Sequence, residues 1–279
     1  MATVLVTGAA RGIGRAVALR LEAAGWAVVA GVRREADGEA LVAAGGGRIV
    51  PVPLDVTDPE QVAALDGALP KRLDGVVNNA GIVVSGPVEG VPVEDLRRQL
   101  EVNVVGQVAV TQAVMSRLRA AQGRVVFLSS LSGRVATPMT GPYNASKFAL
   151  EAIADCLRME VRPWGVRVVL IEPAQTDTDL WGQADTALEE SVEALAPIHP
   201  ALYAKHIEGS RKMIPRSQRM ASPVDGVAAA VERALTARRP RARYVVGAGP
   251  RVQSVLSQVT PTAARDALLS AATGVPRRP

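Results

Sequence analysis

The sequence predicts a doubly wound parallel α/β sheet of about seven strands, with helices on both faces. Short apolar runs alternate with longer segments of helical spacing along most of the chain. The runs are apolar on both sides, as strands are when helices cover both faces of a sheet. A glycine-rich turn follows the first run, where such Rossmann-type sheets bind phosphate groups. At 279 residues, the chain suits one large domain, 1–279.

The seven predicted strands are short and rich in β-branched residues. They lie at residues 3–7, 27–32, 49–54, 75–77, 125–128, 166–171 and 244–246. Between them, helical spacing predicts helices at residues 15–24, 39–44, 93–119, 142–161 and 223–237. A further helix should begin at Pro59, because Asp58 is a favourable N-cap and proline suits the first helical position. The long helix should bend at Gly106.

The regular alternation stops after Pro173. Residues 178–222 contain two expected short helical segments and several prolines, at positions 197, 200 and 215. Because so long a segment between regular elements is usually functional or mobile, we interpret it as a flap that covers the substrate. The tail at 251–269 is expected to be helical, and the last three residues to be frayed.

Tyr143 and Lys147 lie four residues apart at the start of a predicted helix, so they share one helical face. A free tyrosine, with a pKa of about 10, does not release its proton near neutrality, and a nearby cation lowers that pKa. Ser130, at the end of the preceding strand, can hydrogen-bond the same substrate oxygen. The pattern therefore indicates proton transfer, although taken alone it is also typical of an ordinary solvent-exposed pair.

Two further motifs accompany this pair: Thr7-Gly8-x3-Gly12-Ile13-Gly14 at the first turn, and Asn78-Asn79-Ala80-Gly81 after the fourth strand. In this combination and order, residues 2–180 resemble the short-chain dehydrogenase/reductase family. The remaining residues are similar to the family in layout only, and look closest to members that act on steroids, retinoids and similar lipophilic carbonyls.

The resemblance implies a nicotinamide coenzyme and its binding residues. Glycines let the backbone approach a pyrophosphate, and the next helix presents its N-terminus to it. The positions implied to line the coenzyme are Gly8, Arg11, Gly12, Ile13, Gly14, Arg33, Arg34, Asp55, Val56, Asn79, Ala80, Gly81, Tyr143, Lys147, Pro173, Thr176 and Thr178. Asp55 is equally typical of a turn or capping residue. Ala174 stands where the family usually has glycine, which restricts that loop slightly.

The end of the second strand favours NADP(H) over NAD(H). An acidic residue there would hydrogen-bond the ribose 2′-hydroxyl and repel a 2′-phosphate. This chain has Val32 at that position, followed by Arg33 and Arg34, and Arg11 lies inside the glycine turn. Guanidinium groups pair well with phosphate. The alternative is that these are ordinary surface arginines.

By the same resemblance, Tyr143 is the general acid/base, Lys147 lowers its pKa and holds the nicotinamide ribose, and Ser130 polarises the carbonyl. Asn103 anchors a water chain to Lys147, or is simply a satisfied polar residue of the core. For the substrate, we expect Ser130 and Tyr143 together with mostly apolar positions, of which several could instead only pack the flap: Ser85, Val135, Met139, Pro142, Gln175, Leu180, Trp181 and Ile198. His199 and His206 are expected to be structural.

The expected function is NADP(H)-dependent interconversion of a lipophilic carbonyl, steroid- or retinoid-like, and its alcohol. Two alternatives remain open: a 3-oxoacyl thioester reductase, and a catalytically silent NADP(H)-binding regulator. The sequence does not identify the substrate, the direction in the cell or the oligomeric count. Members of the family commonly associate through their long helices, so we expect a homo-oligomer, either a dimer or a tetramer.

The composition of the chain argues against several kinds of partner and site. The net charge of +5 is dispersed apart from the cluster at residues 238–243, so we expect no nucleic-acid partner. One cysteine and two histidines make a protein-built metal site improbable, and the single cysteine fits a reducing compartment. We find no signal peptide and no apolar run of about 20 residues, so we expect a cytoplasmic protein without an integral membrane segment.

Overall fold

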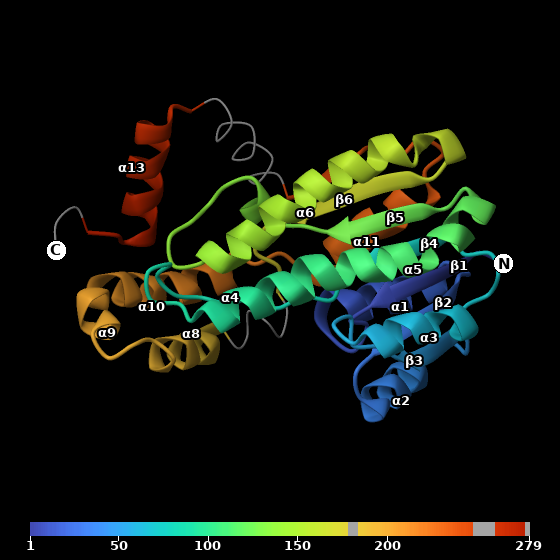
Figure 1. The fold of residues 1–279 in the computed structure, drawn as a ribbon, viewed down its shortest axis with the longest axis horizontal. Coiled ribbons are helices and arrows are strands. Elements are labelled where there is room, and N and C mark those ends of the chain that lie inside the picture. Colours follow the sequence, from blue (N-terminus) through green and yellow to red (C-terminus); the bar gives the residue numbers. More distant parts are fainter. Residues whose placement is uncertain (178–183, 248–259, 277–279) are drawn as a thin grey trace.

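The computed structural model describes residues 1–177, 184–247 and 260–276. Its centre is one parallel sheet with the strand order β3-β2-β1-β4-β5-β6-β7. The strands are β1 Thr3–Thr7, β2 Ala27–Val32, β3 Ile49–Pro53, β4 Gly75–Asn78, β5 Arg124–Leu128, β6 Arg167–Pro173 and β7 Arg243–Val246. The predicted doubly wound parallel sheet is therefore confirmed (Figure 1).

Helices cover both faces of this sheet. One face packs on α1 Gly12–Ala23, α2 Glu35–Ala44 and α11 Val224–Thr236. The other packs on α3 Pro59–Ala68, α5 Gly106–Ala121 and α6 Gly141–Glu160. The remaining helical segments are α4 Val93–Leu100, a π-helical turn η1 at Glu101–Val105, the 3-10 turns η2 Leu131–Gly133 and η3 Arg162–Trp164, α8 Ala184–Glu193, α9 His199–Leu202, α10 Ala204–Arg219 and α13 Thr262–Thr273.

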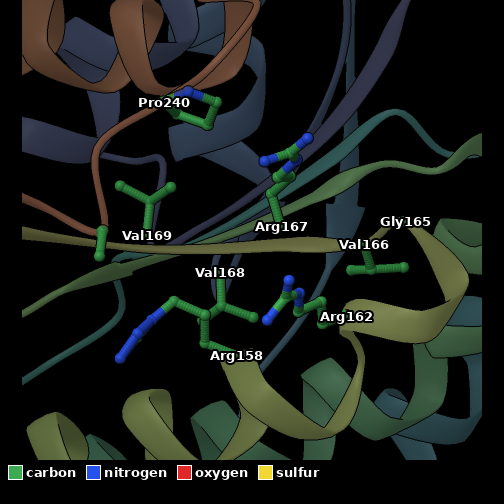
Figure 2. A pocket seen from close by; sticks show the side chains of 9 residues that line it. Arg158, Arg162, Gly165, Val166, Arg167, Val168, Val169 and Pro240 are labelled. Carbon is green, nitrogen blue, oxygen red and sulfur yellow. The ribbon is translucent and has the colours of Figure 1, made fainter.

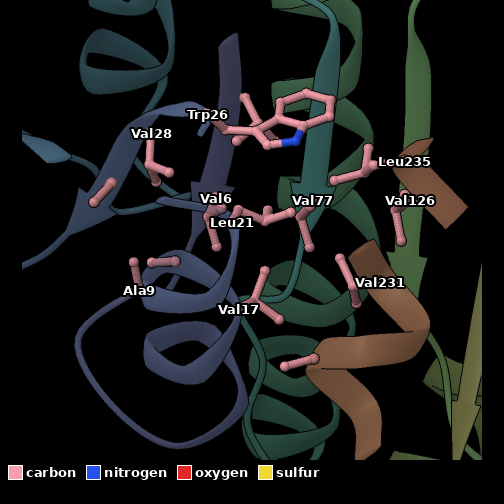
Figure 3. Close-up of a cluster of buried hydrophobic side chains, with 14 of the residues drawn as sticks. Val6, Ala9, Val17, Leu21, Trp26, Val28, Val77, Val126, Val231 and Leu235 are labelled. Carbon is pink, nitrogen blue, oxygen red and sulfur yellow. The ribbon is translucent and has the colours of Figure 1, made fainter. Parts of the chain in front are cut away.

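Alternating side chains of each strand build the two halves of the core. In β1, Val4 and Val6 point to one face, where α1 and α11 supply Val17 and Val231, while Leu5 points to the other. Figure 3 shows the first of these clusters, in which the side chains of both helices meet the strands. Because a strand repeats every two residues, apolar residues at successive positions bury both faces and fix the register of the sheet.

The capping prediction at α3 is confirmed, because the Asp58 carboxylate accepts hydrogen bonds from the backbone N–H groups of Glu60 and Gln61. The second helix is longer than predicted, because α2 begins at Glu35, one turn earlier than expected. Its first turn is acidic and lacks the apolar spacing on which the prediction depended. The long helix contains a π-helical turn at 101–105, immediately before the bend predicted at Gly106.

The flap region also differs from expectation. Residues 184–222 hold three helices rather than two short segments, and Pro215 lies inside α10 instead of ending it. Thr178, Leu180, Trp181, the first half of the predicted C-terminal helix and the last three residues lie outside the described part of the chain. The described tail helix is α13.

The helices α8, α9 and α10 gather at the end of the molecule toward which the strands point, and α13 stands against α10 (Figure 1). These last two helices pack closely at Gly209, where an added Cβ would lie 2.7 Å from the carbonyl oxygen of Thr273. Across residues 1–177, 184–247 and 260–276, every helix is too short or too polar to cross a lipid bilayer.

Candidate active site

The predicted site residues lie at the carboxyl ends of four adjacent strands. Gly8 follows β1, Asn79 follows β4, Ser130 follows β5, and Pro173 ends β6. The connections from β1 and β4 run to opposite faces of the sheet, because α1 packs on one side and α5 on the other. Ligands of doubly wound sheets bind in the crevice that forms at such a switch point.

The glycine turn is closely packed against the β4 end. Gly8 has a left-handed backbone, with φ of 63°, and a Cβ added to Gly14 would lie 2.2 Å from the Gly8 carbonyl oxygen. The Asn79 side chain donates hydrogen bonds to the carbonyls of Thr7 and Gly8 at 2.9 and 3.1 Å. The Thr7 hydroxyl in turn accepts from the backbone N–H groups of Asn79 and Ala80. Asn79 therefore braces the turn.

This turn fits a dinucleotide. The missing side chains of Gly8 and Gly14 let the turn pack closely on Ala80 and on itself, and α1 begins at Gly12 with Arg11 as its N-cap residue, so that its N-terminus is available to a pyrophosphate. The Arg11 side chain does not cap that helix end, so the first N–H groups of α1 can face an anion.

Ser130, Tyr143 and Lys147 come together at the end of β5. Ser130 follows the strand, and α6 brings Tyr143 and Lys147 over it, with the ammonium of Lys147 5.6 Å from the centre of the Tyr143 ring. The Lys147 Nζ donates to the carbonyl of Leu128 at 2.7 Å. The Ser130 hydroxyl interacts with the Tyr143 phenol.

The protonation of this group is set by its burial. Burial raises the pKa of Tyr143, while the Ser130 hydroxyl lowers it. Burial also lowers the pKa of Lys147 to about 8, although the negative charge of Glu151 opposes this shift. Perturbed pKa values that arise from burial and a specific neighbour are typical of catalytic groups.

The buried Asn103 holds the chain that leaves β4. Its side-chain oxygen accepts from the Ile82 N–H at 2.8 Å, and its amide donates to the Ile82 carbonyl and to the Ser146 hydroxyl. Ser146 precedes Lys147, so Asn103 connects this chain to α6. It lies in the π-helical turn, and such turns often occur at functional sites.

Sequence reasoning missed two buried amides that hold the same segment as Asn103. Gln99 bonds the backbone of Ile82 and Val84, and Gln107 donates to the carbonyl of Ala80, both side chains being fully buried. The missed signal is the spacing 99, 103, 107, which places three amides on one face of a helix. Together they hold residues 80–84.

The arginines after β2 are not equivalent. Arg34 is bound to Asp37 by two hydrogen bonds, at 2.7 and 2.8 Å, whereas Arg11 and Arg33 have no carboxylate within ion-pair distance in the described ranges. Hydrogen bonding from Arg34 lowers the pKa of Asp37, and the charges of Arg11 and Arg33 also act on it. The charges of all three arginines therefore act on the same carboxylate after β2.

Three other predicted coenzyme positions lie after β3 and β6. Asp55 accepts from the N–H and hydroxyl of Thr57, which is the turn role left open by the sequence, and the Thr57 N–H is the main cause of its lowered pKa. Val56 is buried against Gly106. Thr176 is buried and forms a bridge to Ser222, which fixes the segment after β6 to the end of the flap.

On the expected substrate side, Val135 and Met139 are buried and Gln175 is exposed. Met139 has a left-handed backbone, with φ of 65°, and its carbonyl accepts from the Gly86 N–H at 2.7 Å. A non-glycine residue held in this region is strained, and such strain tends to occur at functional sites. His199 lies against Gly90, in keeping with a packing role.

The parallel sheet and the glycine turn at the end of its first strand are those of a dinucleotide-binding α/β protein. A model of the short chain dehydrogenase family matches residues 2–189. The chain belongs to the short-chain dehydrogenase/reductase family and is an oxidoreductase with an NAD(P)-binding Rossmann-type fold.

Individual relatives match over most of the chain. The NADPH-dependent 3-dehydrocapnine reductase of Ornithobacterium rhinotracheale is 36% identical and covers 87% of each chain. Retinol dehydrogenase 5 of Mus musculus is 34% identical and covers 96% of this chain and 88% of its own. A short-chain dehydrogenase from Burkholderia cenocepacia, solved in complex with NADP, has a TM-score of 0.74 at 26% identity, with 97% of each chain covered.

Proposed function

We propose that this protein is an NADP(H)-dependent oxidoreductase that interconverts a lipophilic carbonyl compound and its alcohol. The observation that carries the proposal is the meeting of Ser130, Tyr143 and Lys147 beside the glycine turn crevice. Relatives named as retinol and estradiol 17-beta dehydrogenases support a lipophilic substrate, and a relative named as NADPH-dependent supports the coenzyme.

Each residue has one task in this proposal. The coenzyme, held along the glycine turn and residues 79–81, supplies or accepts the hydride. Ser130 orients the substrate oxygen by a hydrogen bond, and Tyr143 gives that oxygen a proton during reduction or removes it during oxidation. The charge of Lys147 stabilises the Tyr143 phenolate. Asn103 fixes the backbone on which the crevice is built.

The test is a panel of ketones, aldehydes and alcohols, followed by absorbance of the reduced nicotinamide. Turnover of retinoid- or steroid-like compounds with NADPH supports the proposal. Preference for 3-oxoacyl thioesters would instead support the alternative enzyme. Calorimetric binding of NADPH without turnover of any compound would identify a silent regulator and overturn the proposal.

The coenzyme preference gives a specific prediction. Replacing Arg33 by alanine is expected to lower kcat/KM for NADPH about tenfold or more with little change for NADH, because a charged hydrogen bond to the 2′-phosphate is lost. Arg34→Ala is the matched comparison and should have the smaller effect, since Asp37 already occupies its guanidinium. A wild-type preference for NADH, or equal effects of the two changes, would contradict this assignment.

The pKa of Lys147 predicts a pH dependence. Lysine is charged below its pKa, and burial lowers that pKa to about 8. Since the charge stabilises the phenolate that forms when Tyr143 donates its proton, carbonyl reduction should be fastest below pH 8 and fall as the pH rises through it. The measurement is kcat at saturating NADPH between pH 6 and 10, with circular dichroism as the control for folding. A rate that stays flat from pH 7 to 9 would contradict the role of Lys147.

We further propose one domain, 1–279, with a substrate flap at about 178–222, and a homo-oligomer formed through the long helices in the cytoplasm. Two exposed large apolar residues support the association: Val105 beside α5 and Phe148 on α6 are 50% and 43% exposed. Both lie on the helices that cover one face of the sheet. Sedimentation velocity would measure the oligomeric state.

A further inference from the structure

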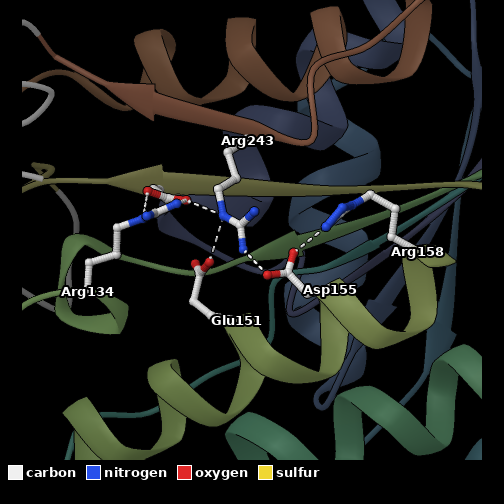
Figure 4. A network of polar contacts seen from close by, with 6 residues as sticks. Arg134, Glu151, Asp155, Arg158 and Arg243 are labelled. Carbon is white, nitrogen blue, oxygen red and sulfur yellow. Dashed lines mark hydrogen bonds and ion pairs between the residues drawn. The ribbon is translucent and has the colours of Figure 1, made fainter. Parts of the chain in front are cut away.

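A network of alternating charges lies behind the candidate active site. Arg243, the first residue of β7, reaches across β6 to three carboxylates (Figure 4). Its Nε lies 3.0 Å from Glu151 and 3.3 Å from Glu172, and a terminal nitrogen lies 2.7 Å from Asp155. The network continues in two directions, from Glu172 to Arg134 and from Asp155 to Arg158.

The members of the network belong to the segments that carry the site. Arg134 lies shortly after Ser130 and η2, and it binds Glu172 through two hydrogen bonds, at 2.7 and 2.9 Å. Glu172 is fully buried next to Pro173, where the predicted coenzyme segment begins. Glu151 and Asp155 lie on α6 beyond Tyr143 and Lys147. Arg243 thus contacts both α6 and the β6 end.

Lys147 lies between two groups on the same face of α6. Tyr143 is four residues before it and Glu151 four residues after it, so the ammonium can approach either. In the structure Lys147 Nζ binds the Leu128 carbonyl near Tyr143, and the carboxylate of Glu151 is bound by Arg243 instead. The negative charge of Glu151 raises the pKa of Lys147, so the two groups already act on each other in the structure.

We propose that Arg243 is a positioning residue for the proposed reaction: by binding Glu151, it keeps that carboxylate from drawing Lys147 away from Tyr143. Without Arg243, Glu151 has no guanidinium partner in the described ranges and lies near the buried Glu172. A buried carboxylate that loses its partner is destabilised unless it pairs with another cation or takes up a proton. The nearest cation on its own helix face is Lys147.

This inference assigns a role to one residue of the basic cluster at 238–243 and separates it from the others. Arg241, two residues earlier, donates its backbone N–H to the Tyr244 hydroxyl, and within the described ranges its guanidinium has no carboxylate at ion-pair distance. Arg158, at the outer end of the network, lines an open groove together with Arg162 and Arg167 (Figure 2). In the part of the chain that the structure describes, the ion-pair partner of Arg158 is Asp155, so its loss leaves Glu151 paired with Arg243.

The test compares Arg243→Met with Arg241→Met. The first is expected to lower kcat, measured per NADPH-binding site, about 10- to 100-fold, because small displacements of a catalytic group have large effects on rate. KM and the Kd of NADPH should change less than about threefold. Arg241→Met should keep wild-type kcat. Counting NADPH sites by calorimetry removes the contribution of unfolded protein.

Two further variants separate positioning from a general loss of stability. Arg243→Lys keeps the charge and should recover part of kcat. The double variant Glu151→Gln/Arg243→Met should be faster than Arg243→Met, because the carboxylate that draws Lys147 is gone. Unchanged kcat in Arg243→Met, or a double variant no faster than the single one, would overturn the inference.

The inference rests on the proposed function, and the two can fail separately. Wild-type protein that turns over no carbonyl or alcohol would contradict the proposed function alone. A crystal structure of Arg243→Met then decides the inference without activity: Lys147 Nζ is expected to leave the Leu128 carbonyl and bind Glu151. Retention of the 2.7 Å contact to Leu128 in that variant would overturn it.

Discussion

Replacing Tyr143 by phenylalanine is expected to lower turnover about 10²- to 10⁴-fold, the usual contribution of one general acid. In the proposed reaction the phenol exchanges a proton with the substrate oxygen; it interacts with Ser130, and the centre of its ring lies 5.6 Å from the Lys147 ammonium. The phenylalanine ring fills the same space, so NADPH affinity should persist. Steady-state kinetics and calorimetry measure the two effects.

The matched control for this change is Tyr244→Phe. The Tyr244 hydroxyl accepts a hydrogen bond from the Arg241 backbone at 3.2 Å, away from the strand ends that hold the site. Its removal should leave turnover within about twofold, as for a surface substitution. Near-native turnover of Tyr143→Phe would remove Tyr143 from its proposed role.

The second large effect is expected at the glycine turn. In Gly14→Ala, the new Cβ would lie 2.2 Å from the Gly8 carbonyl oxygen and 2.5 Å from the Asn79 side-chain nitrogen, so the turn has to open. Overpacking of this kind costs about 1–3 kcal/mol of stability. We expect NADPH affinity to fall about 100-fold, equivalent to about 2.8 kcal/mol, because the backbone no longer fits the pyrophosphate.

Gly67→Ala provides the control for a glycine-to-alanine change. Gly67 lies in α3, and an added Cβ there would meet no atom within 4 Å. Alanine should stabilise that helix by up to about 1 kcal/mol and leave NADPH binding unchanged. Calorimetry of both variants measures affinity, and thermal unfolding measures stability. If Gly14→Ala bound NADPH as tightly as Gly67→Ala does, the glycine turn would not be the pyrophosphate site.

Sequence patterns predicted the regular part of the fold closely. The seven strands lie within two residues of their expected ends, because β-branched runs bounded by glycine or proline are local signals. The Asp58 cap was predicted for the same reason. The start of α2, the third flap helix and the helical position of Pro215 were not, since packing against other elements stabilises them despite weak local patterns.

The sequence named candidate site residues, but it did not specify the contacts that those residues make. The structure brings Ser130, Tyr143 and Lys147 together and places Asn103 one hydrogen bond from Ser146. The hydrogen bonds of Gln99 and Gln107 to residues 80–84 depend on how the long helix packs, which a linear pattern does not specify. The pairing of Arg34 with Asp37, which leaves Arg33 as the freer guanidinium, is equally a product of the folded chain.

By itself, the sequence determined the alternation of strands and helices, the glycine turn and the four-residue spacing of phenol and ammonium. All of these depend on interactions between near neighbours in the chain. The tertiary structure alone decided how deeply Lys147 is buried and that Arg243, 92 residues from Glu151, binds that carboxylate. Burial and ion pairing depend on which distant segments share a space, and that is settled only when the sheet is assembled.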